Sequence, residues 1–176
     1  MREVTDPLYI HEDDWAMIDL VPVENAADAA RVAAEADAHA EAHRAPSGVG
    51  WTAMYMVPAP SVPLRVRGLT VDAVRATLGP AFGPVRAVVS GYSTYRENVP
   101  RAFALAGGGG ILYGTAAADG VLDGLHLLIT SEDPAFAAAL VALGRAHGLL
   151  LLDWWRHTQV DLRDADAVAR WIADPA

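Results

Sequence analysis

The sequence predicts a single α+β domain over residues 1–176, with two layers, a mixed and mostly antiparallel sheet, and helices mainly on one face. Residues 124–155 support this class, because they have the order strand, helix, strand with a break at each joint. The length supports it too, since 176 residues can bury roughly 70% of the unfolded surface in one core. A ferredoxin-like β-α-β arrangement is one candidate within the class.

The strand-helix-strand unit has a recognisable residue at every joint. After the apolar run 125–130, Asp133 can accept the free N–H groups of a helical first turn, and Pro134 suits the first helical position. Gly148 can adopt the left-handed conformation that ends a helix. Four leucines follow at 149–152, which predicts a strand buried on both faces.

The N-terminal part predicts two short strands and a long helix. The strands are Leu8–His11 and residues 15–21, and the helix is residues 26–44 with Asn25 as its cap. At 100° per residue the helix has an alanine-rich face, which we expect to pack on the sheet. This face comprises Ala26, Ala29, Val32, Ala33, Ala36 and Ala40. The side beside it is charged and comprises Asp28, Arg31, Glu35 and His39.

The remaining elements are predicted from short apolar runs and from the proline, glycine and capping residues that separate them. A strand is expected at residues 51–57, apolar on both faces, before a stiff connector that contains Pro58, Pro60 and Pro63. A helix at Val71–Leu78 is capped by Thr70. The other expected strands are residues 85–90, 102–106, 111–117, 125–130 and 159–162, with a polar loop at 91–101 and a glycine turn at 107–110. A last helix, residues 165–172, is capped by Asp164.

Two segments share the pattern L-G-x-A-x-G, at residues 78–83 and 143–148, and each precedes an apolar strand. The repeat admits two interpretations. One is an internal duplication of a helix-strand unit around residues 71–90 and 134–154. The other is coincidence in a chain that is rich in alanine and glycine.

Composition limits the classes of partner. The net charge is −9 and every basic residue is arginine, so the field of the chain repels phosphate backbones and we expect no nucleic-acid partner. A basic protein suits this charge better. The chain has no cysteine, which excludes a disulfide scaffold and a thiolate metal site. No run approaches the roughly 20 apolar residues that span a bilayer, so we expect a cytoplasmic protein with no membrane partner.

Two groups of residues suggest metal or acid-base chemistry. Glu35, His39 and His43 recur every four residues on one helix, which stacks three metal-capable side chains on one face. His11, Asp13 and Asp14, with Glu12, form a carboxylate-rich turn that could hold a hard cation. A straight stripe does not converge on one point, and turns favour aspartate for its own backbone bonds. We therefore expect no cofactor and no resident metal.

Two aromatic segments are candidate binding surfaces. Trp154 and Trp155 follow the leucine run beside His157, and in a strand the two tryptophans would face opposite sides of the sheet. The loop at 91–101 offers Tyr92, Tyr95 and Arg96. Exposed tryptophan, tyrosine and arginine are typical of protein interfaces.

These observations predict a non-catalytic domain that self-associates or binds protein. We expect a homodimer, because the mean hydropathy is positive (+0.21) in so acidic a chain and leaves apolar surface to be covered. An acidic regulator or inhibitor of a basic protein is one form of this function. The alternative is a small-molecule or metal-dependent enzyme that uses His11, Asp13 and Asp14, or Glu35, His39 and His43.

Overall fold

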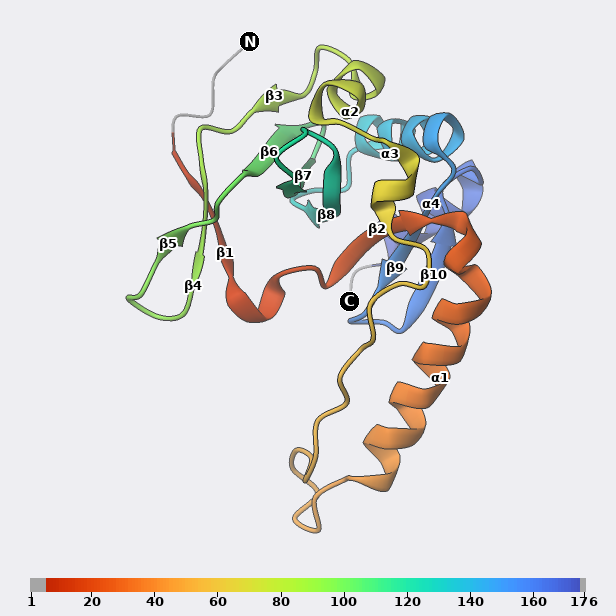
Figure 1. Cartoon of the computed structure of the whole chain (residues 1–176). Helices are drawn as coiled ribbons and strands as arrows, with labels where there is room; N and C mark the ends of the chain where they lie inside the picture. The colour runs from red at the N-terminus through yellow and green to blue at the C-terminus, as the bar shows by residue number, and fades with distance from the viewer. Residues whose placement is uncertain (1–5, 175–176) are drawn as a thin grey trace.

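The computed structural model describes residues 6–174 as four α-helices, three short 3₁₀ helices and two sheets (Figure 1). The seven-stranded sheet has, in spatial order, β10 (Thr158–Asp161), β9 (Leu149–Asp153), β2 (Ile18–Pro22), β8 (Leu122–Ile129), β7 (Gly110–Ala116), β6 (Ala102–Gly107) and β3 (Gly83–Pro84). The three-stranded sheet has β1 (Leu8–His11), β4 (Val88–Gly91) and β5 (Glu97–Asn98). The helices are α1 (Ala26–Ala42), α2 (Val71–Leu78), α3 (Pro134–His147) and α4 (Ala165–Ala173). The predicted α+β class is confirmed.

Strand pairing is antiparallel throughout the large sheet, and β1 and β4 form a parallel pair in the small one. Strand β2 pairs antiparallel with both β8 and β9, so the unit β8-α3-β9 is a parallel pair split by β2. The order β9-β2-β8-β7, with α2 and α3 on one face, is that of a ferredoxin-like unit. The joints of this unit form as predicted: Asp133 accepts from Ala135 N at 2.8 Å, and Gly148 has a φ of 61°.

Helices lie mainly on one face of the large sheet. Helices α2, α3 and α4 bury their apolar sides there in the main core, with Leu149 and Leu151 of β9 beneath them. The opposite face carries α1, which packs on Val21, Leu150 and Leu152. Further along that face, the three-stranded sheet covers β6 and β7. Both faces of the large sheet are therefore covered.

Several predicted boundaries were wrong in detail. The second strand begins at Ile18, because residues 12–17 form a 3₁₀ turn and a loop that lead from one sheet to the other. Of the strand predicted at 85–90, only residues 88–90 lie in a strand, which is β4 of the small sheet, and the two-residue β3 before it belongs to the large sheet. Helix α1 ends at Ala42, and Asn25 makes no side-chain capping bond to it. After α2 the chain passes through β3 of the large sheet into β4 of the small sheet, whereas after α3 it enters β9 of the large sheet. An internal duplication stays a prediction.

The strand predicted at residues 51–57 does not belong to either sheet. Trp51 forms a single isolated bridge with Arg44, and residues 53–60 have no assigned strand or helix. The local sequence has strand character, but no second strand of the described chain lies beside it. This prediction was wrong because a strand requires a neighbour, and apolar alternation alone does not supply one.

Substitutions on α1 test the packing of its alanine face. Ala36 is 7% exposed, so Ala36→Glu places a carboxylate without a partner in a closed site on the buried side of α1. We expect this variant to lose several kcal/mol of unfolding free energy. Ala38 is exposed on the same helix, and Ala38→Glu should unfold near the wild-type temperature. Thermal unfolding measures both, and equal shifts in the two variants would contradict the assigned faces.

Candidate functional site

The most prominent surface feature is an arm that projects from the body of the domain (Figure 1). We define the arm as residues 37–63: the end of α1, a tip at 43–50, and a returning segment at 51–63. Helix α1 buries Ala29, Val32 and Ala36 but no residue after them. The returning segment then runs back along the helix in an extended conformation.

The arm carries most of the exposed apolar surface. Nine large apolar side chains are exposed in residues 6–174, and five of them lie between positions 49 and 57. They are Val49 (82% exposed), Trp51 (65%), Met54 (86%), Met56 (81%) and Val57 (44%). Residues 45–63 contain no charged side chain. Apolar surface of this extent on one extended segment is typical of an interaction site.

The returning segment alternates between two faces, as an extended chain does. Ala53 and Tyr55 are half-buried, and the Tyr55 hydroxyl reaches Glu35 of α1, whereas Met54 and Met56 are exposed. The Tyr55 ring lies 5.6 Å from that of His39. Between α1 and the segment is an open hollow of about 210 Å³. The segment therefore contacts α1 along one face without packing closely on it.

The backbone of the segment is held at its ends and free between them. Thr52 N donates to His43 O at 2.8 Å, and Val62 N donates to Asn25 Oδ1 at 2.9 Å. Between these two anchors, no amide from Ala53 to Ser61 donates to another backbone group of the described chain. The middle of the segment thus resembles the edge strand of a sheet, with backbone N–H groups that no neighbouring strand of the described chain accepts.

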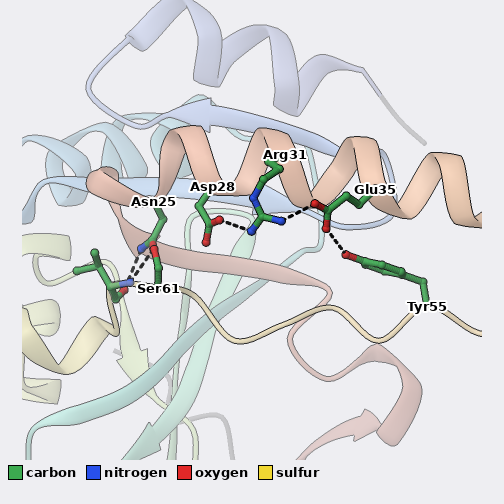
Figure 2. A network of polar contacts seen from close by, with 7 residues as sticks. Asn25, Asp28, Arg31, Glu35, Tyr55 and Ser61 are labelled. Carbon is green, nitrogen blue, oxygen red and sulfur yellow. Dashed lines mark hydrogen bonds and ion pairs between the residues drawn. The ribbon is translucent and has the colours of Figure 1, made fainter.

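Asn25 is the main anchor of the returning segment (Figure 2). Its side chain is 2% exposed. The amide donates to Pro22 O at 3.0 Å and to Val62 O at 2.9 Å, and its oxygen accepts from Ser61 Oγ and Val62 N. One buried side chain thereby satisfies the 3₁₀ turn before α1 and the end of the returning segment.

A row of polar contacts on α1 makes the second anchor (Figure 2). Arg31 pairs with Asp28 and, at 2.6 Å, with Glu35. Tyr55 OH donates to the other oxygen of Glu35 at 3.1 Å. Desolvation, and then the bond to Glu35, raise the pKa of the Tyr55 hydroxyl, while Arg31 and Tyr55 lower the pKa of the Glu35 carboxyl.

The candidate metal stripe on α1 is used for other contacts. Glu35 is occupied by Arg31 and Tyr55. The rings of His39 and His43 lie 4.2 Å apart. Among residues 6–174, no group of three His, Cys, Asp or Glu side chains lies close enough to hold a metal ion.

The acidic turn and the aromatic loop both lie at the three-stranded sheet. His11 Nδ1 accepts from Asp13 N at 3.2 Å, which closes the turn that contains Asp14. The ring of Tyr92 meets that of His11 edge-on. Tyr95 OH donates to Glu97, and the Arg96 guanidinium lies 4.2 Å from the centre of the Tyr9 ring. Tyr92 and Tyr95 are exposed, so this surface stays a candidate for binding.

The two adjacent tryptophans lie in a turn, not in a strand. Strand β9 ends at Asp153, whose carboxylate accepts the N–H groups of Trp155 and Arg156 at 3.0 and 3.2 Å and turns the chain. Strand alternation therefore does not apply to them. Trp154 packs toward α1, and Trp155 is 60% exposed.

His157 joins that turn to the arm. Its Nδ1 lies 2.5 Å from Asp37 Oδ1 on α1. Between α1 and β10 is a cavity of about 310 Å³, with Trp154 and His157 in its wall. Its apolar lining comes mostly from α1 alanines, namely Ala29, Ala30, Ala33 and Ala34.

A buried polar cluster, which the sequence did not indicate, lies between the large sheet and the loop before β2. His126 is 7% exposed and meets the rings of Trp15 and Tyr113. Its Nδ1 is 3.1 Å from Asp19 Oδ1, although the geometry is not that of a hydrogen bond. Burial raises the pKa of Tyr113 to about 12. Such enclosure leaves little room for a substrate at this cluster.

Comparison with models of protein families, with curated proteins and with solved structures found no match. Within residues 6–174, none of the helices has the length and apolar character that crossing a bilayer requires.

The composition of residues 45–63 is a signal for the arm in the sequence. Residues 45–63 carry no charge and four prolines, at 46, 58, 60 and 63. A charge-free, proline-rich stretch seldom forms a buried strand, since proline removes ladder donors. This stretch, which also holds Trp51 and two methionines, therefore indicated an exposed apolar segment.

Removal of the Asn25 side chain should release the returning segment. Asn25→Ala leaves Val62 N and two backbone carbonyls without partners in a buried position, so we expect a loss of about 1–3 kcal/mol in unfolding free energy. Cleavage within residues 51–61 by a protease should become faster. Ser61→Ala is the matched control, because it removes only the Ser61 Oγ bond to Asn25 and keeps the bonds of Asn25 to Pro22 and Val62. Equal cleavage rates in Asn25→Ala and the wild type would contradict the anchoring role.

Titration of Tyr55 tests the second anchor. Its pKa is raised, so the uncharged hydroxyl favours the folded contact, which is complete below about pH 10 and is lost as the pH rises through the folded pKa. Tyrosinate absorbance, wild type minus Tyr55→Phe, isolates this group among the five tyrosines. In Glu35→Gln the pKa should fall toward its ordinary value without reaching it, because desolvation persists. An unchanged pKa would contradict the Tyr55–Glu35 contact.

Proposed function

We propose that this chain is a non-catalytic protein-binding domain, and that the arm is its contact surface. The observation that carries the proposal is the returning segment itself. It presents four exposed apolar side chains, Trp51, Met54, Met56 and Val57, and a free backbone edge on one extended stretch. Extended segments of this kind bind proteins by adding a strand, with main-chain bonds for affinity and alternate side chains for specificity.

The side chains suit a contact of this type. Covering a methionine fully contributes roughly 1.5–3 kcal/mol, and Met54 and Met56 are 86% and 81% exposed. Methionine also adapts its shape to a partner surface. The anchors at Asn25 and Glu35 hold the segment in place before binding, which reduces the entropy that a partner would have to restrict.

The charge of the chain supports binding in a different way. A net charge of −9 would speed the approach of a basic protein. The absence of charge in residues 45–63 means that contacts at the arm itself are apolar. A basic partner of an acidic, cytoplasmic regulator would therefore make its charged contacts outside the arm.

Site-specific photocrosslinking tests the proposal. The full chain carries a photoreactive residue at position 54 in cells that express it, and a matched variant carries it at the exposed position 38 on the charged side of α1. We expect a covalent adduct with protein, either a second copy or another chain, from position 54 and none from position 38. No adduct from position 54, or equal adducts from both positions, would overturn the proposal.

A further inference from the structure

We propose that the partner at the arm is a second copy of this chain, and that residues 53–57 of the two copies pair as antiparallel strands about a twofold axis at Tyr55. This inference rests on the proposed binding role of the arm. Its first support is the sequence Ala-Met-Tyr-Met-Val at residues 53–57. The stretch has nearly the same residues in both directions from Tyr55, so an antiparallel pair centred there sets Met54 opposite Met56 of the second copy.

The backbone donors give the second support. Successive N–H groups of an extended chain point to opposite edges. On the even-numbered edge from 52 to 62, only Met54 and Met56 keep an N–H group without a backbone acceptor, because Thr52 and Val62 donate within the chain and Pro58 and Pro60 have no N–H. The odd-numbered edge keeps the N–H groups of Ala53, Tyr55 and Val57 without a backbone acceptor. These are the three residues that a pair centred on Tyr55 would bond.

The distribution of charge permits a second copy to bind at the arm. Two copies that each carry a net charge of −9 repel at most faces. Residues 45–63 form an exception, because they contain no charged residue and bring no like charges together. A foreign basic partner would find no carboxylate in this stretch to bind.

The available surface suits a dimer of moderate affinity. A standard interface buries about 800 Å² on each partner. The five exposed side chains at positions 49–57 and the strand edge supply a surface on the order of several hundred Å². We therefore expect the full chain, of 18.6 kDa, to sediment as a dimer at tens of micromolar and to dissociate on dilution.

Single cysteines test the register, because the natural chain has none. In the proposed pair, position 54 lies about 4.5 Å from position 56 of the second copy, at a pair without mutual hydrogen bonds. Positions 54 and 54, or 56 and 56, are diagonal and about 7–8 Å apart. Under mild oxidation, a mixture of Met54→Cys and Met56→Cys chains should yield about ten-fold more disulfide dimer than either variant alone, since bridging fails beyond roughly 7 Å.

Two proline variants test the backbone bonds. Val57→Pro removes a donor of the proposed pair, whereas Ala59→Pro lies outside residues 53–57 in the same proline-rich stretch. Val57→Pro should be a monomer where the wild type and Ala59→Pro are dimers, while circular dichroism shows that all three are folded. Equal dimerisation of the two proline variants would overturn the inference, and so would equal disulfide yields in mixed and unmixed samples.

Sedimentation and crosslinking together separate a wrong partner from a wrong binding surface. A wild-type chain that stays a monomer at 18.6 kDa overturns the self-pairing. If position 54 still gives an adduct with a different protein in cells, the binding role of the arm is supported and only the identity of the partner is wrong. If position 54 gives no adduct, both are overturned.

Discussion

The four leucines of β9 are buried on both faces of the large sheet, and the placement of the helices on these two faces depends on their burial. Leu149 and Leu151 face α3 and α4, while Leu150 and Leu152 face α1. Each buried leucine contributes roughly 1.5–3 kcal/mol when covered. A sheet that is apolar on both faces requires a cover on each, so α1 lies on the face opposite to the other three helices.

The arm is a consequence of how α1 covers that face. The helix has seventeen residues, but only Ala29, Val32 and Ala36 are buried, all in its first eleven residues. An alanine contributes little apolar area, so the contact with the sheet is modest and the rest of the helix extends beyond it. The returning segment then depends on polar anchors, at Asn25 and at Tyr55 with Glu35, and not on a core. These anchors hold the backbone and leave Met54 and Met56 exposed.

Local patterns in the sequence predicted most of the elements but not the partners between them. Helix α2 with its Thr70 cap, helix α3 with Asp133 and Gly148, and the double burial of β9 follow from adjacent residues and were confirmed. Asn25 is predicted as a cap because capping residues are recognised locally, but it bonds to Pro22 and to Ser61 and Val62, which lie 36 and 37 positions away. Residues 51–57 were assigned to a strand for the same reason. Pairing between distant segments is decided by the tertiary fold, which one sequence does not display.

The returning segment is a strand edge that has no partner strand within residues 6–174. Amide hydrogen exchange resolved by residue tests it directly, at a dilution where the chain is a monomer and at a concentration where it associates. The account predicts that Ala53, Tyr55 and Val57 exchange near the rate of an unprotected amide in the dilute sample and become protected on concentration, while the amides of β9 are protected in both. Protection of all three in the dilute monomer would show a partner within the chain and would contradict the claim. Fast exchange of all three at high concentration would contradict the pairing of two copies.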